Sequence, residues 1–234
     1  AKPEEQKFLL ALALAPLIRL VSLSMPLLEF EYQYWYMVIG LPLLVASAAV
    51  YRISGYRRSH IGLALGKYLP FQFVVAVAGV GLGYLEYMIL KPEPLTDSFS
   101  FQSVWLPAII LLIFTGFLEE LIFRGLMQRA AADQLRKLGP FYISLLFAVL
   151  HIGYKSFVDL IFVFLVGFAF SLVAQHTRSL LGITIAHGLT NISLFLIFPF
   201  ILVSPLQFSL PSFGSPIPPT STVQVIEVVQ STAV

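Results

Sequence analysis

The chain has 234 residues, of which 58% are hydrophobic and 11% are charged, and its formal net charge is +2. A soluble domain typically carries about 25% charged residues, so this composition excludes an ordinary soluble fold. The small net charge argues against nucleic acid as a partner, and the absence of cysteine excludes disulfides, thiolate catalysis and Cys-type metal sites.

Long, continuous apolar runs predict an all-α fold, a polytopic helical membrane protein with about seven transmembrane helices. A transmembrane barrel would instead show short segments of alternating hydrophobicity. The predicted spans cover residues 8–25, 34–51, 71–90, 105 to beyond 124, 141–152, 157–174 and 180–203.

Two of the early spans have features that affect their packing. Pro16 and Arg19 interrupt the first run, which predicts a kinked helix whose arginine extends to the membrane interface. The third run contains Gly79, Gly81 and Gly83, and small residues of this kind let two helices approach closely.

The loops that follow the second, fourth and sixth spans are basic, and the opposite loops are mainly acidic. By the positive-inside rule, the basic loops and the N-terminus face the cytoplasm, and we expect a bacterial inner (plasma) membrane protein. Glu86 is expected close to the outer interface, without a function, and Asp159 is one of the acids of the opposite loops. The basic residues of the cytoplasmic side are Arg52, Arg57, Arg58, Lys67, Arg129, Arg136, Lys137 and Arg178.

The composition changes after the last span. Residues 209–234 are rich in proline, serine and threonine and are expected to form an extended extracytoplasmic tail. Residues 1–208 are expected to form one transmembrane domain, with the motifs described below in a core at 105–191.

Three of the later spans carry polar side chains that a purely structural helix would not need. A charge at the centre of a membrane helix costs roughly 2.5–3.5 kcal/mol on insertion scales, and such groups usually mark a functional site. The polar residues are Glu119, Glu120 and Arg124 in the fourth span, His151 in the fifth, and His187 and Asn191 in the seventh.

These groups are predicted to lie at one level. With a helix rise of about 1.5 Å per residue, Glu119, His151 and His187 lie ~15, ~18 and ~14 Å from the basic ends of their spans. The similar depths predict one shared site.

Spacing within the fourth span separates its two acids. Glu120 and Arg124 are four residues apart and can pair on one helix face. Glu119 points roughly 100° away and stays free to react.

The residue types then suggest a reaction. A carboxylate (Glu119) and an imidazole (His151) can take a proton from water, which then attacks an amide carbonyl. His187 and Asn191 project together, and can stabilise the resulting oxyanion. This chemistry is hydrolysis of a peptide bond within the membrane.

The three patterns resemble the signature motifs of the CPBP family (Abi, CAAX protease and bacteriocin-processing), which includes the type II CAAX prenyl endopeptidases. The motifs are Glu119-Glu120-x-x-x-Arg124, Phe147-x-x-x-His151 and His187-x-x-x-Asn191. The resemblance implies a glutamic-type intramembrane protease that acts on a peptide or a lipidated protein. It further implies that Glu119 and His151 activate water, that His187 and Asn191 form the oxyanion hole, and that Glu120, Arg124 and Phe147 support the site.

Three alternatives remain open at this stage. The protein could be a non-catalytic scaffold or assembly subunit of a larger membrane complex, or Glu119, His151 and His187 could relay protons. The same three residues could also bind zinc. The sequence contains no HExxH motif, so we expect no cofactor. The expected partners are membrane lipids and the substrate, together with other membrane subunits in the scaffold alternative.

Overall fold

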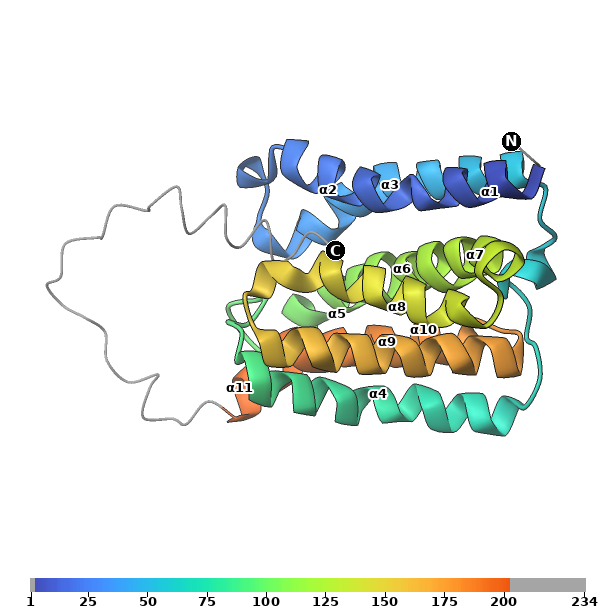
Figure 1. Ribbon diagram of the computed structural model, residues 1–234. Helices are drawn as coiled ribbons and strands as arrows, with labels where there is room; N and C mark the ends of the chain where they lie inside the picture. The colour runs from blue at the N-terminus through green and yellow to red at the C-terminus, as the bar shows by residue number, and fades with distance from the viewer. Residues whose placement is uncertain (1–2, 203–234) are drawn as a thin grey trace, which may run out of the picture.

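The computed structural model describes residues 3–202, which form a bundle of helices without any strand in that range (Figure 1). Six helical stretches in it are long and apolar enough to cross a membrane. The longest, Phe101–Tyr154, turns back on itself at the short helix η6 (Arg136–Leu138), so the chain makes about seven crossings. The predicted all-α, multi-pass membrane protein is therefore confirmed. The predicted tail and its boundary at residue 208 lie outside the described residues, and that division stays a prediction.

The helices outside the motif region follow the predicted spans within a few residues. They are α1 (Pro3–Leu12), α2 (Leu14–Ser24), η1 (Leu27–Glu29), η2 (Tyr32–Tyr34), α3 (Trp35–Ser54), η3 (Arg58–Ile61), α4 (Leu69–Leu90) and α9 (Phe157–Thr177).

The motif region is more irregular, because π-helical segments interrupt its α-helices. Its elements are α5 (Phe101–Ile110), the π-helix η4 (Leu111–Phe117), α6 (Leu118–Glu120), the π-helix η5 (Leu121–Met127), α7 (Gln128–Leu135), α8 (Gly139–Leu150), η7 (His151–Tyr154), α10 (Leu181–Ile192), the π-helix η8 (Ser193–Ile197) and α11 (Phe198–Leu202).

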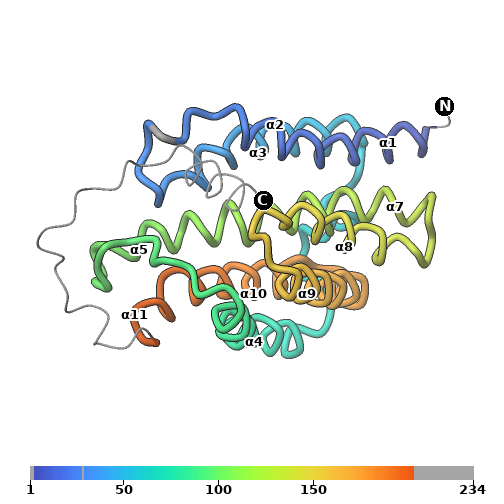
Figure 2. The backbone as a smooth tube through the Cα atoms, turned by 60° about the vertical axis from the view of Figure 1, so that its left-hand side comes forward, coloured from blue at the N-terminus to red at the C-terminus, as the bar shows by residue number. Residues whose placement is uncertain are grey.

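The helices are arranged in three layers (Figures 1 and 2). α1, α2 and α3 form one outer layer, and α4, α9 and α10 form the other. The segment from α5 to η7 lies between them, and it carries Glu119, Glu120 and His151. Polar side chains of this middle layer are therefore shielded from lipid on both sides.

The first span is broken where its proline requires it. α1 ends at Leu12, and α2 begins at Leu14, two residues before Pro16. A proline cannot donate to the carbonyl four residues earlier, and its ring clashes with that carbonyl, here that of Leu12. The predicted kink is confirmed. The guanidinium of Arg19 donates to the backbone carbonyl of Leu150, a contact within the bundle that the sequence analysis did not predict, and its position at the interface stays a prediction.

Glycine allows α4 to pack directly on α10. A Cβ atom added at Gly79 or Gly83 would collide with the backbone of Ala186 or Thr190, and the Thr190 hydroxyl donates to the Gly79 carbonyl at 3.1 Å. The predicted close approach is confirmed for these two glycines. Gly81 lies on another face, with nothing within 4 Å of the added atom. The tight contact fixes the helix that carries His187 and Asn191.

Loops of like charge gather at the same end of the bundle, as predicted. The N-terminus, the α3–α4 connection, η6 and the α9–α10 connection lie together at one end (Figure 1). The connections after α2, α4 and α8 lie at the opposite end. Which end faces the cytoplasm stays a prediction.

Candidate active site

The two adjacent acids lie on a short α-helical segment between two π-helical ones. α6 contains only Leu118, Glu119 and Glu120, and η4 and η5 flank it. π-Helical turns are rare and occur frequently at functional sites, because the extra residue redirects the side chains around it. Both glutamates are buried in the interior of the bundle rather than facing lipid.

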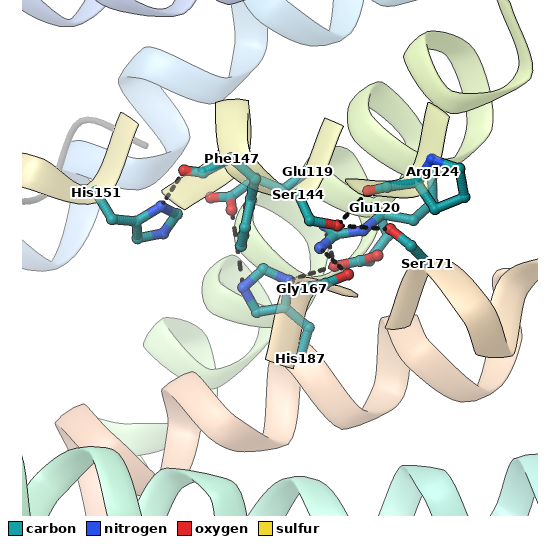
Figure 3. Close-up of polar contacts among 10 residues, drawn as sticks. Glu119, Glu120, Arg124, Ser144, Phe147, His151, Gly167, Ser171 and His187 are labelled. Carbon is teal, nitrogen blue, oxygen red and sulfur yellow. Dashed lines mark hydrogen bonds and ion pairs between the residues drawn. The ribbon is translucent and has the colours of Figure 1, made fainter. Parts of the chain in front are cut away.

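Glu120 is the centre of a buried polar network (Figure 3). Its Oε1 atom lies 3.0 Å from Nη1 of Arg124 and 2.8 Å from Nδ1 of His187. Nη2 of Arg124 also donates to the carbonyl of Gly167 at 3.0 Å. The predicted Glu120–Arg124 pair is present, and its side chains are fully buried. Because a carboxylate only accepts, Nδ1 of His187 carries the proton that is shared with Glu120.

Glu119 has the free carboxylate, as its position in the helix predicts. Its Oε2 atom is buried and has no hydrogen-bond partner within residues 3–202. The same atom lies 3.7 Å from Nε2 of His187, which is beyond a good hydrogen bond but close enough for electrostatic attraction (Figure 3). His187 therefore lies between the two acids, with one ring nitrogen toward each.

His151 lies where α8 ends inside the bundle. The carbonyl of Leu150, one of the last in this helix, would be unpaired there, and Arg19 from α2 donates to it. Nδ1 of His151 lies 2.9 Å from the carbonyl oxygen of Phe147. A carbonyl only accepts, so Nδ1 carries the proton, and Nε2 of a neutral ring is left with a free lone pair. The fifth span is short because it ends here.

The ring of Phe147 connects the charged groups. The guanidinium of Arg124 stacks over it with its carbon 4.3 Å from the ring centre, and the ring centres of His151 and His187 are 4.5 and 6.0 Å away. An aromatic face attracts a cation and also excludes water from the ion pair. The predicted contact between Phe147 and His151 is confirmed, and Phe147 contacts the other two motifs as well.

Two small cavities connect the three motifs. One, of about 20 Å³, is lined by Glu119, His151 and Asn191, and the other, of about 40 Å³, by Glu120, His151, His187 and Asn191. A cavity needs roughly 10–15 Å³ to hold a water molecule, so each is large enough for at least one. The structure thus brings together all seven residues that the sequence analysis selected, and it leaves their roles open.

Glu86 is a site residue that the sequence analysis missed. It is 7% exposed and lines both cavities, so it points into the protein, and the expectation that it has no part in a site does not fit this placement. The sequence does indicate that Glu86 faces the interior, because it lies seven residues after Gly79 and three after Gly83, and residues at these spacings share a helix face. Tyr36 and Tyr154 also line the cavity of Glu119.

Asp159 is a second buried acid that the sequence analysis did not select. It is fully buried in the first turn of α9, and neither carboxyl oxygen has a hydrogen-bond partner among the described residues. Its backbone N–H is bound by the hydroxyl of Ser156, which caps the helix. The sequence offers no signal for this burial.

Within residues 3–202, no group of three His, Asp or Glu side chains has the arrangement of a metal site. Glu119, His151 and His187 line neighbouring cavities, but they do not converge on one point as zinc ligands do. The expectation that no cofactor is needed stays a prediction.

Comparison with known proteins bears on the same part of the chain. Residues 101–193, which contain all three motifs, match the family model described as type II CAAX prenyl endopeptidase Rce1-like. No curated protein and no solved structure matches the chain. This match confirms the resemblance predicted from the three motifs: residues 101–193 are similar to the Rce1-like type II CAAX prenyl endopeptidases.

Proposed function

We propose that the protein is an intramembrane endopeptidase that hydrolyses a peptide bond with water activated by Glu119 and His151. The observation that carries the proposal is the cavity that Glu119, His151 and Asn191 line together, which has room for a water molecule. The cavity lies in the segment that is similar to CAAX prenyl endopeptidases, which supports the proposal that the protein is a protease. The match gives no support to the alternative of a non-catalytic subunit.

Glu119 and His151 each have an atom that can accept a proton from water. Oε2 of Glu119 has no hydrogen-bond partner among the described residues, and Nε2 of His151 has a free lone pair when Nδ1 donates to Phe147. Either atom can take the proton of a water molecule as its oxygen attacks the substrate carbonyl. The new C–O bond produces a tetrahedral oxyanion.

Asn191 and His187 are suited to the second half of the reaction. The side-chain amide of Asn191 can donate to the oxyanion from the wall of the cavity. His187 donates from Nδ1 to Glu120, so its donation from Nε2 requires the doubly protonated ring, whose charge the two flanking acids balance. When the intermediate collapses, the C–N bond breaks, and the proton taken from water passes to the leaving amine.

Glu120 and Arg124 act as positioning residues in this proposal. Their ion pair fixes the ring of His187 through the bond to Glu120, and it is anchored to α9 through Gly167. A pair buried this deeply is strongly destabilising to break, because one charge is then left without a partner.

The substrate is a peptide or a lipidated protein that enters from the surrounding membrane, in line with the prenylated substrates that the family's description names. We also propose that the basic end of the bundle faces the cytoplasm of a bacterial inner membrane, as the positive-inside rule predicts.

The test is cleavage by the purified protein in proteoliposomes of a peptide panel with and without a prenylated C-terminal cysteine motif. Glu119→Gln should reduce the cleavage rate at least about 100-fold, because a general base contributes 10²–10⁴-fold. Glu93→Gln changes an exposed acid outside the cavities and should cleave at the original rate. Cleavage at the original rate by Glu119→Gln would exclude the proposed base.

A further inference from the structure

A second, larger hollow lies at the basic end of the bundle, away from the cavities of the candidate active site. This groove has a volume of about 790 Å³ and runs between the η3–α4 connection, α7 and the end of α9. A volume of this size is typical of a site for a small molecule or a headgroup. Nothing in the proposed protease chemistry uses it.

The charged side chains that line the groove are all basic. They are Lys67, Arg124, Arg129 and Arg178, and His60 lies beside them. No described aspartate or glutamate side chain lines it. Low-dielectric walls that carry one sign of charge focus the field and attract an ion of opposite sign.

The side chains of Lys67 and Arg178 are available for a ligand. Each is exposed, and neither has a hydrogen bond or ion pair within residues 3–202. By contrast, Arg129 lies 3.4 Å from Asp133, and Arg124 is held by Glu120. Two basic side chains thus face the groove without any acid to neutralise them.

Two buried donors on the wall are also unpaired. Nε of Arg124 and Nε of Arg129 have no hydrogen-bond acceptor among the described residues, and Arg124 is only 4% exposed. A buried N–H group without an acceptor is rare in a native structure and calls for an explanation. These two N–H groups are closed to the groove as the side chains stand, so the exposed side chains of Lys67 and Arg178 are the ones that can meet an anion. Guanidinium groups such as that of Arg178 bind phosphoryl oxygens well.

We propose that this groove binds a phosphoryl anion, carried either by the headgroup of an anionic phospholipid or by a soluble phosphate. The shared chemistry is a tetrahedral phosphoryl group whose non-bridging oxygens share the negative charge and face Lys67 and Arg178. Exposed apolar side chains at Leu65 and Tyr68, next to Lys67, offer contact to the acyl chains of a lipid. The site is separate from the catalytic cavity, since the Arg124–Glu120 pair lies between them.

The test is the thermal melting midpoint of the purified full chain in a neutral detergent, titrated with four probes. Dioctanoyl phosphatidylglycerol carries the phosphoryl group, and dioctanoylglycerol has the same chains without it. Inorganic phosphate is compared with chloride at equal ionic strength. A ligand that binds only the folded protein raises the midpoint in a saturable way.

The expected result is saturable stabilisation by phosphatidylglycerol, by inorganic phosphate, or by both, and none by dioctanoylglycerol or chloride. Stabilisation by phosphatidylglycerol alone identifies a lipid headgroup, stabilisation by phosphate alone identifies a soluble ligand, and stabilisation by both identifies a site for the phosphoryl group from either source. The double variant Lys67→Gln/Arg178→Gln should raise the half-saturating concentration at least tenfold, and each single variant should raise it by less.

The matched control is Arg136→Gln/Lys137→Gln, which removes the same charge at the same end from exposed residues outside the groove. This control should leave the half-saturating concentration unchanged. Equal losses in the two double variants would mean a general charge effect and would overturn the proposal. So would the absence of saturable stabilisation by either phosphoryl probe, or equal stabilisation by dioctanoylglycerol.

Discussion

Gly167 lies outside the three motifs, yet the structure predicts that it is needed for the candidate site. A Cβ atom at this position would lie 2.9 Å from Nη2 of Arg124 and 3.1 Å from a ring carbon of Phe147. The first distance is too short for a non-bonded contact, and the second is shorter than most contacts of a Cβ atom. Since the backbone of α9 is fixed by its neighbours, Gly167→Ala must displace the side chain of Arg124.

The loss of stability caused by Gly167→Ala can be estimated from the contacts that are lost when Arg124 moves. Overpacking a well-packed site costs about 1–3 kcal/mol. A hydrogen bond to a charged group, such as the one between Arg124 and the Gly167 carbonyl, contributes about 1.5–3 kcal/mol. The clash is with the flexible end of a side chain, so part of it is relieved, and we expect a loss of about 2–4 kcal/mol in the free energy of unfolding.

Unfolding by sodium dodecyl sulfate in mixed micelles measures this free energy, and peptide cleavage measures the effect on the site. The matched control is Gly81→Ala, where the added methyl group meets nothing within 4 Å. Alanine is the better helix former by up to about 1 kcal/mol, so this control should be neutral or slightly stabilising. If Gly167→Ala and Gly81→Ala have the same free energy of unfolding and the same rate of peptide cleavage, the proposed support of Arg124 by α9 is incorrect.

Three further predictions concern the same network. Arg124→Lys keeps the charge but not the planar fork, so it should lose one of the contacts to Glu120 and Gly167 and about 1–3 kcal/mol of unfolding free energy in the same titration. Phe147→Ala should lower the free energy of unfolding by about 3–5 kcal/mol, since it removes a buried ring that contacts Arg124 and both histidines. Phe147→Leu retains most of the side-chain volume and should lower it by less. Equal stability of the original protein and the two variants would contradict the central role of the ring. Dialysis against a chelator should leave cleavage unchanged, since the sequence contains no HExxH spacing; stoichiometric zinc in metal analysis, together with loss of activity on its removal, would contradict this expectation.

The convergence of Glu119, His151 and His187 could be predicted because helix geometry is regular. A fixed rise per residue converts a position in the sequence into a depth in the membrane. The i,i+4 spacing likewise predicted the contact between Glu120 and Arg124, which the structure shows at 3.0 Å. These predictions use only the local geometry of a helix, and the contact forms although Arg124 lies in the π-helix η5.

Contacts between distant segments could not be predicted in the same way. Arg19 pairs with the carbonyl of Leu150, 131 residues further along the chain. A lone arginine in an apolar run has the same sequence pattern whether it extends to the interface or caps a buried helix end. The sequence analysis likewise predicted one continuous span here and no π-helical turns on either side of Glu119.

Glu86 shows that two sequence arguments answer different questions. Its distance from the end of α4, about 6 Å at four residues, placed it near the outer interface. Its helix face indicates its direction, because Gly79, Gly83 and Glu86 recur at the spacing of one side of a helix. That side is packed on α10, as the collisions predicted for a methyl group at Gly79 and Gly83 show, whereas Gly81 on another side meets only open space. The depth of a residue gives only the level of its side chain in the membrane, whereas its helix face indicates whether the side chain points into the protein. An acid on a glycine-packed face therefore belongs among the candidate site residues even when its depth suggests an interface.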